Sequence, residues 1–200
     1  MTKTIYMDYA ATTPLDPRVK DRMLECMGHE AGFGNPSSAL HSYGEQAARE
    51  LARAAEEVSS LINCAPAELV WTSGATESDN LAIIGAARFR EMRGRHIVTT
   101  AIEHKAVLES CAWLATQGYS VTYVQPDAMG RVAPSAIAEA LTADTILVSV
   151  MHANNETGVV QDIAAIGELC RERDILLHVD AAQSAGKLPI DVRAMQIDLL

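Results

Sequence analysis

The chain has 200 residues, of which 48% are hydrophobic and 21% charged, and its formal net charge at pH 7 is −10. This composition is typical of a globular domain and excludes collagen-like, disordered and disulfide-scaffold chains. No apolar run approaches the roughly 20 residues that span a bilayer, and residues 1–9 contain no apolar signal-peptide core. We therefore expect a cytoplasmic protein that has no membrane partner.

The charges and the cysteines exclude two further classes of function. The 16 basic and 26 acidic side chains form no basic stripe, so no nucleic-acid partner is expected. The four cysteines lie far apart and include no C-x-x-C pair, which argues against a zinc ribbon or a dithiol redox centre. We expect free thiols and no metal site.

The first 61 residues predict helices and loops without strands. Residues 7–14 are expected to form an extended arm that ends in a turn, and residues 17–27 a helix. Residues 32–38 are rich in turn formers, and residues 46–61 predict an amphipathic helix with many Ala and Glu residues.

From about residue 64 onward, apolar strands alternate with helices. Strands are predicted at 69–72, 96–100, 121–125, 145–151, 175–179 and 197–200, and helices at 77–93, 105–117, 134–141 and 163–173. This alternation predicts an α/β fold, a largely parallel mixed sheet with helices on both faces. Ligands bind at the carboxyl ends of the strands in such sheets, so the loops after residues 72, 100, 151 and 179 are candidate sites.

The first of these loops, residues 72–80, has the sequence TSGATESDN and leads into a helix. Small residues at a helix start leave backbone N–H groups available, and the helix dipole favours an anion there. Gly74 permits close approach and Thr76 adds a hydroxyl, which suggests a phosphate site; a simple N-cap formed by Ser73 or Thr76 is the alternative. The loop matches neither G-x-x-x-x-G-K-[ST] nor G-x-G-x-x-G, which argues against nucleoside triphosphates and dinucleotides.

The second and third loops offer an imidazole and a group of polar side chains. His104 lies just past a strand end, where it either stacks on a flat ligand and moves protons or caps the following helix. An uninterrupted apolar strand runs into a polar segment that contains Asn154, Asn155 and Glu156. These three residues either orient a polar ligand or form a turn.

The fourth loop begins with Asp180, which follows a buried strand. Its carboxylate is expected in a low-dielectric environment with a specific partner: a metal, a ribose or a protonated ring nitrogen. A structural cap is the alternative. The metal is disfavoured because His178 and Asp180 are the only metal-ligand residue types close in sequence there.

The four loops together supply a phosphate site, a stacking imidazole, an amide and a buried carboxylate. Pyridoxal 5'-phosphate (PLP) requires this set of groups. Its phosphate favours a helix N-terminus, its ring needs a stacking partner, and its pyridine nitrogen needs a carboxylate that keeps it protonated.

The chain resembles the N-terminal half of the cysteine desulfurases of the iron–sulfur cluster assembly type, which are class V aminotransferases within fold type I of the PLP enzymes. The resemblance covers essentially all 200 residues in order. It rests on residues 6–14 (YMDYAATTP), 34–38 (GNPSS), 72–83 (TSGATESDNLAI), 103–107 (EHKAV), 152–162 (HANNETGVVQD) and 178–183 (HVDAAQ).

The resemblance implies a role for each candidate site residue. The backbone of Ala75 and the side chain of Thr76 would bind the phosphate of PLP. His104 would stack on the pyridine ring and assist proton transfer, and Asn155 would help to hold the phenolic oxygen or the substrate carboxylate.

Two further roles follow from the same resemblance. Asp180 would pair with the pyridinium nitrogen, and Gln183 would donate a hydrogen bond to the phenolic oxygen. Members of the family convert L-cysteine to L-alanine and leave a persulfide on an enzyme cysteine, for iron–sulfur cluster and thio-cofactor assembly. The implied partners are L-cysteine, a second copy of the chain in a homodimer, and a scaffold or sulfur-acceptor protein.

Three parts of the family's machinery have no counterpart in the sequence. The Schiff-base lysine, the nucleophilic cysteine and the arginine that binds the substrate carboxylate all occur later in family members. We therefore expect an N-terminal fragment that is inactive alone and whose sheet is incomplete at the C-terminus. Residues 1–15 are expected to be an arm that packs on the small domain of the full enzyme, and residues 16–200 part of the PLP-binding large domain.

Two other functions stay open at this point. A selenocysteine lyase or a cysteine sulfinate desulfinase shares most of these motifs and differs in its substrate. A catalytically inactive binding partner of the same fold would lack the lysine without being a fragment.

Overall fold

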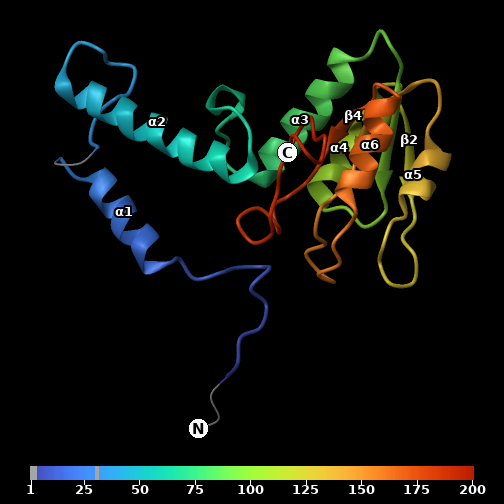
Figure 1. Cartoon of the computed structure of the whole chain (residues 1–200), viewed down its shortest axis with the longest axis horizontal. Helices are drawn as coiled ribbons and strands as arrows, with labels where there is room; N and C mark the ends of the chain where they lie inside the picture. Colours follow the sequence, from blue (N-terminus) through green and yellow to red (C-terminus); the bar gives the residue numbers. More distant parts are fainter. Residues whose placement is uncertain (1–3, 30–31) are drawn as a thin grey trace. The chain divides into compact units, whose positions relative to one another are not determined.

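The computed structural model describes residues 4–29 and 32–200 and divides the chain into two compact units (Figure 1). The first unit extends to Leu69, and the second comprises Val70–Leu200. The sequence predicted a division after residue 15 instead. That prediction concerns the packing of a complete enzyme, and it stays a prediction.

The first unit consists of helices α1 (Pro17–Met27) and α2 (Ser42–Ile62) and the short 3-10 helix η1 (Pro66–Glu68). The helix predicted at 17–27 is confirmed, and its N-cap Asp16 accepts a hydrogen bond from the Arg18 amide at 2.8 Å. No residue of α1 is buried, and in α2 only Gly44 and Ser59 are. The first unit therefore has almost no apolar core of its own.

The second unit is built on four strands, β1 (His96–Thr100), β2 (Ser120–Val124), β3 (Thr145–Ser149) and β4 (Leu176–His178). Their order in the sheet is β2-β1-β3-β4, and every neighbouring pair is parallel. The predicted largely parallel sheet is confirmed, and all three ladders that join the four strands are parallel.

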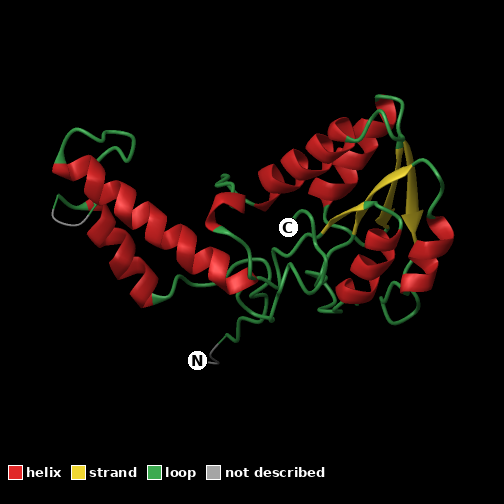
Figure 2. Cartoon of the chain, turned by 45° about the horizontal axis from the view of Figure 1, so that its top comes forward, coloured by secondary structure: helices red, strands yellow, loops and turns green. Residues whose placement is uncertain are grey.

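Two pairs of helices cover the sheet. Helices α3 (Ala75–Phe89) and α4 (Lys105–Thr116) pack on each other, as do α5 (Pro134–Ala140) and α6 (Ile163–Glu172), and Figure 2 shows the strands between the two pairs. The step from β1 to β2 runs in the opposite direction from the steps through β3 to β4. Because parallel crossovers are right-handed, this reversal places α4 on one face and α5 and α6 on the other.

The apolar core lies between the sheet and the α3–α4 pair. Ile97 of β1 and Leu147 of β3 face Ile83, Val107 and Leu114 of the two helices, and all five side chains are almost completely buried. Burial of such side chains contributes roughly 1.5–3 kcal/mol each. Both β1 and β3 are buried along their whole length because they are the central strands, whereas β2 is an edge strand with exposed residues.

Two predicted strands differ from the structure. The strand predicted at 69–72 is wrong: these residues join no ladder among the described residues, and Val70 and Trp71 are 71% and 57% exposed. The strand predicted at 197–200 is reduced to one parallel bridge between Leu199 and His178. An apolar run becomes a strand only where a neighbouring backbone pairs with its N–H and C=O groups. In the part of the chain that the structure describes, no helix is both long and apolar enough to cross a membrane.

Candidate cofactor site

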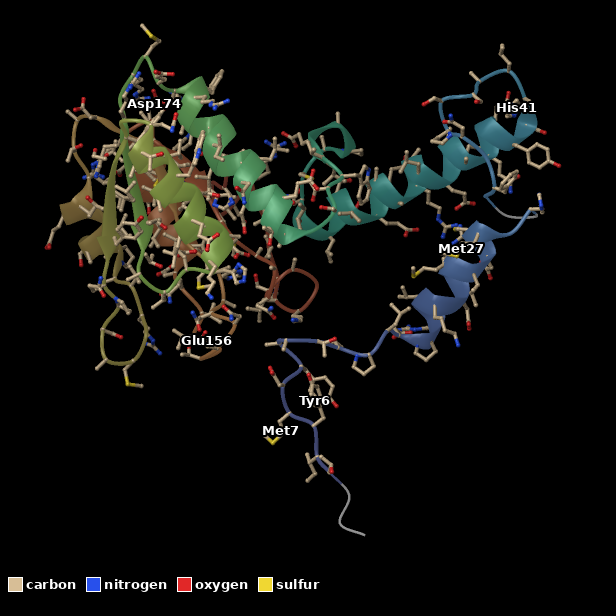
Figure 3. The ribbon with its side chains drawn as sticks, turned by 180° about the vertical axis from the view of Figure 1, so that it is seen from behind. Tyr6, Met7, Met27, His41, Glu156 and Asp174 are labelled. Carbon is tan, nitrogen blue, oxygen red and sulfur yellow. The ribbon has the colours of Figure 1, made fainter. Side chains whose placement is uncertain are left out.

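The candidate residues of the second unit gather at the edge of the sheet where the parallel strands end. Because β1, β3 and β4 all run the same way, the loops that carry His104, Asn155 and Asp180 leave the sheet at the same edge. Figure 3 shows Glu156, in the loop after β3, at one end of the second unit and Asp174, in the loop before β4, at the other.

The N-terminus of α3 begins without a side-chain cap. Gly74 is the N-cap residue and its backbone is extended, with a φ of 159°; the space where a Cβ would lie contains nothing within 4 Å. Ser73 does not cap the helix, because its hydroxyl, like its amide, donates to the Glu77 carboxylate. The first amides of the helix, at Ala75 and Thr76, therefore face an open space that the helix dipole makes favourable for an anion.

His104 caps the following helix, which is one of the two roles that the sequence left open, and its role toward a flat ligand stays a prediction. It is the N-cap of α4, and its Nδ1 accepts a hydrogen bond from the Ala106 amide at 3.2 Å. An imidazole whose Nδ1 accepts a hydrogen bond has its proton on Nε2 when it is neutral. The side chain is exposed, so the capping contact fixes the ring while its faces stay available to a flat ligand.

Asp180 lies two residues after the buried end of β4 and is itself 8% exposed. Its Oδ1 accepts a hydrogen bond from the Ala182 amide at 2.9 Å. Burial raises the pKa of the carboxyl above its usual range, and the charge of Asp79 adds to this rise. The Ala182 hydrogen bond, His178 and His104 act in the opposite direction and lower that pKa. A cationic group in contact with Asp180 would also lower that pKa and would favour the ionised carboxylate.

Two side-chain amides lie at the same edge. Asn155 is half-buried, and its side chain has no hydrogen bond from any residue that the structure describes. Gln183 is also half-buried, and its Oε1 accepts a hydrogen bond from the Lys187 ammonium at 3.2 Å. Asn154 instead shapes the turn, because its Oδ1 accepts hydrogen bonds from the amides of Glu156 at 3.0 Å and Thr157 at 2.8 Å.

A buried polar layer beneath Asp180 escaped the sequence analysis. His178 is 1% exposed; its Nδ1 lies 2.8 Å from the Ser149 hydroxyl, and its Nε2 lies 3.5 Å from the carboxylate of Asp79. His178 is the last residue of β4, and Asp180 follows it two residues later. The available signal was the histidine in the apolar segment 175–179, because a buried imidazole requires a polar partner.

Glu103 also escaped the sequence analysis. Its carboxyl is 6% exposed and its Oε1 accepts hydrogen bonds from the Thr100 hydroxyl at 2.6 Å and the Met151 amide at 2.9 Å. Burial raises the pKa of Glu103 to about 8, and the charges of Asp180 and Asp79 add to this rise. The position of Glu103 just past a buried strand resembles that of Asp180, which is the signal that could have found it.

These groups fit PLP. Uncapped helix amides suit its phosphate, an exposed imidazole suits its ring, and a buried carboxylate suits its ring nitrogen. The unpaired amide of Asn155 suits a polar substituent of the ring or of a substrate.

Comparisons with known proteins identify the family. Residues 5–200 match the family described as aminotransferase class V. Cysteine desulfurase IscS of Vibrio atlanticus (strain LGP32) is 54% identical over 200 residues, which are 100% of this chain and 50% of that protein. The protein of the same name from Shewanella sediminis (strain HAW-EB3) is 56% identical with the same coverage. The chain thus spans about half the length of the curated relatives that it matches.

Solved structures agree with the sequence match. A structure described as SspA in complex with cysteine has a TM-score of 0.91 and 42% identity, and the match covers 98% of this chain and 55% of that one. A NifS-like protein has a TM-score of 0.90 and 38% identity, with coverage of 97% and 53%. Class V aminotransferases, cysteine desulfurases included, use PLP, in agreement with the groups at the sheet edge. The chain belongs to the class V aminotransferase family.

Proposed function

We propose that the protein is a PLP-dependent cysteine desulfurase that converts L-cysteine to L-alanine. In this reaction the C–S bond of cysteine breaks, Cβ gains a proton, and the sulfur forms an S–S bond with an enzyme cysteine, which becomes a persulfide. The observation that supports the proposal most directly is the placement of an uncapped α3 N-terminus and the buried Asp180 at one sheet edge. The IscS relatives, at 54–56% identity, support the choice of reaction within the family.

The residues of the α3 start and of the loop after β1 would bind the cofactor from two sides. The amides of Ala75 and Thr76, with the Thr76 hydroxyl, would hold the phosphate by charge-assisted hydrogen bonds. The His104 ring would lie against the pyridine ring and, through Nε2, move a proton to or from the substrate. PLP, when bound, supplies an electron sink for the bonds at the substrate Cα.

The remaining three site residues would orient the ring. Asp180 would hold a proton on the pyridine nitrogen, because its buried carboxylate gains most from a cationic neighbour. Gln183 would donate a hydrogen bond from its amide to the phenolic oxygen, and Asn155 would donate to that oxygen or to the substrate carboxylate.

A matched pair of aspartate variants tests the proposal in the protein as its gene encodes it. Asp180→Asn removes the charge at the site, and Asp174→Asn removes a charge from an exposed residue at the opposite end of the sheet (Figure 3). Loss of one buried charge-assisted hydrogen bond is expected to weaken PLP binding roughly tenfold or more. The measurements are the PLP dissociation constant from absorbance and the release of alanine and sulfide from L-cysteine.

The outcomes separate this function from its alternatives. We expect wild-type protein and Asp174→Asn to bind PLP and to form alanine from L-cysteine, and Asp180→Asn to do both poorly. Faster turnover of selenocysteine or cysteine sulfinate would assign the protein to the related lyases. Absence of PLP binding by the wild-type protein would support a catalytically inactive binding partner.

We further propose that the protein is a cytoplasmic homodimer that passes its persulfide sulfur to an acceptor or scaffold protein for iron–sulfur cluster assembly. The names of the IscS relatives support the desulfurase chemistry behind this proposal. Exposed apolar side chains on α1, including Val19, Met23, Leu24 and Met27, support burial against a second surface. Light scattering after size-exclusion chromatography should give twice the mass of one chain.

A further inference from the structure

We propose that Glu103 and Asn154 form a loop clamp, a pair of positioning residues that fixes His104 and Asn155 relative to each other at the cofactor site. The inference rests on the proposed function and deepens it. It concerns two loops, residues 101–104 after β1 and residues 150–158 after β3.

The first half of the loop clamp is the Glu103 side chain. It turns inward while its neighbour His104 is exposed. Glu103 Oε1 accepts a hydrogen bond from the hydroxyl of Thr100, the last residue of β1, and another from the amide of Met151 in the loop after β3. The carboxyl thus takes the place that a backbone carbonyl would occupy if the β1–β3 ladder continued.

The second half is the Asn154 side chain, which extends from the loop after β3 to the loop after β1. Its Nδ2 donates to the carbonyl oxygen of Ile102 at 3.0 Å. Its Oδ1 holds the Asn155–Thr157 turn through the amides of Glu156 and Thr157. Each member of the loop clamp therefore directly precedes a candidate cofactor contact, His104 in one case and Asn155 in the other.

The two contacts replace pairing that the strands no longer supply. The β1–β3 register ends at Thr99 and Ser149, before either loop begins. The loop after β3 is joined by the backbone to β4 and to the residues that follow it, because the Val150 amide donates to the His178 carbonyl at 3.1 Å and the His152 amide to the Asp180 carbonyl at 2.9 Å. With the loop clamp closed, the segments that carry His104, Asn155 and Asp180 form one connected unit.

The protonation state of Glu103 gives the loop clamp a measurable pH dependence. Three titratable groups interact electrostatically with Glu103: Asp79 of α3, Asp180 after β4 and Cys111 of α4. The pKa of about 8 keeps Glu103 protonated at neutral pH. Burial is the largest cause that disfavours the ionised carboxylate, and the charges of Asp180 and Asp79 add to it, whereas the hydrogen bonds from Thr100 and Met151 act in the opposite direction. Because burial outweighs these two hydrogen bonds, we expect ionisation to loosen the clamp.

The test uses the protein as its gene encodes it, four single variants and the double alanine variant. Glu103→Ala and Asn154→Ala open the loop clamp, whereas Glu103→Gln keeps a neutral acceptor at the same position. Glu109→Ala is the matched control, because Glu109 lies exposed on α4, six residues along the chain. All variants are first checked by thermal unfolding, and Glu103→Gln keeps the test decisive if an alanine variant fails to fold.

The first readout is PLP affinity. At pH 7 we expect Glu103→Ala and Asn154→Ala to bind PLP roughly tenfold more weakly, and Glu103→Gln and Glu109→Ala to stay near wild type. The double alanine variant should lose less than the product of the two single losses, because both residues serve one contact. Between pH 7 and pH 9, wild-type affinity should fall relative to that of Glu103→Gln. Equal affinity of Glu103→Ala and wild type, or failure of Glu103→Gln to restore binding, would overturn the inference.

The second readout needs no PLP and separates this inference from the proposed function. Relaxation of a carbon-13-labelled His104 ring reports its mobility in the cofactor-free protein. We expect greater ring mobility in Glu103→Ala than in wild type, Glu103→Gln or Glu109→Ala. If the wild-type protein does not bind PLP, the proposed function fails and this readout still decides the loop clamp. An unchanged His104 ring in Glu103→Ala would overturn it.

Discussion

At the scale of single residues, the buried Glu103 makes the stability of the second unit depend on pH. Its pKa is about 8 in the folded chain and near 4.5 when exposed, so between these values the folded state holds a proton that the unfolded state has lost. The stability that this proton contributes is fully present below about pH 4.5 and is lost as the pH rises through about 8.

The matching experiment is chemical denaturation at several pH values. The slope of the unfolding free energy against pH is proportional to the difference in bound protons between the unfolded and folded states. Between pH 5 and pH 8, folded Glu103 holds up to one proton more than unfolded Glu103, so the unfolding free energy declines as the pH rises through this range. Glu103→Gln should remove this decline, and Glu109→Gln, at an exposed site, should retain it. Identical pH profiles for wild type and Glu103→Gln would show that Glu103 is ionised in the folded protein.

The loops of the candidate site were predictable from the sequence, but the different orientations of neighbouring side chains within them were not. A strand end followed by a polar residue located His104, Asn155 and Asp180, because parallel strands bring their carboxyl ends to one edge. Sequence alone did not show that Glu103 turns inward while His104 turns outward. That choice depends on the Met151 amide, which is far away in the chain and needs an acceptor.

At the scale of elements, a glycine inside α6 sets how closely the helix approaches the chain after β4. A Cβ at Gly167 would overlap the backbone carbonyl oxygen of Met195. A Cβ at Gly85, on the exposed side of α3, would meet nothing within 4 Å. The same substitution is therefore expected to have opposite effects at the two positions.

Urea denaturation of the two alanine variants measures this difference. Gly167→Ala should destabilise the protein by about 1–3 kcal/mol or more, because backbone must move to make room. Gly85→Ala should stabilise α3 by up to about 1 kcal/mol, since alanine favours the helix more than glycine does. A Gly167→Ala variant as stable as wild type would mean that α6 and residue 195 are not in contact.

The agreement between predicted and observed elements varies along the chain, since α2 begins four residues before its predicted start and α3 ends four residues before its predicted end. Helices α4 and α5 lie within one residue of their predicted bounds, because capping residues and apolar periodicity are local signals. The strand expected at 69–72 does not form, because its pairing depends on a distant backbone neighbour that the sequence pattern does not reveal. The strand predicted at 197–200 is an intermediate case, because it forms a single bridge between Leu199 and His178 of β4.

At the scale of the whole molecule, burial is distributed unequally between the two units. Every buried apolar side chain of the described residues belongs to the second unit, from Ile83 to Ile190. The first unit has amphipathic helices whose apolar residues, among them Met23, Leu51 and Leu61, are exposed. Apolar burial is the main source of folding free energy, so the two units should differ strongly in their resistance to opening.

Hydrogen exchange of the 200-residue chain tests this difference directly. Amides of β1 and β3 are expected to exchange only through global unfolding, because both strands are buried and paired on each side. Amides of α1 should exchange at close to unfolded rates, roughly within a factor of 100, because a short helix without packing is marginal in water. The central amides of α2 should fall between these limits, since its 21 residues favour the helix but bury little. Adding PLP should slow exchange in the loops after β1 and β3 and leave exchange in α1 unchanged. Equal protection of α1 and β1 would mean that the apolar face of α1 is covered in solution.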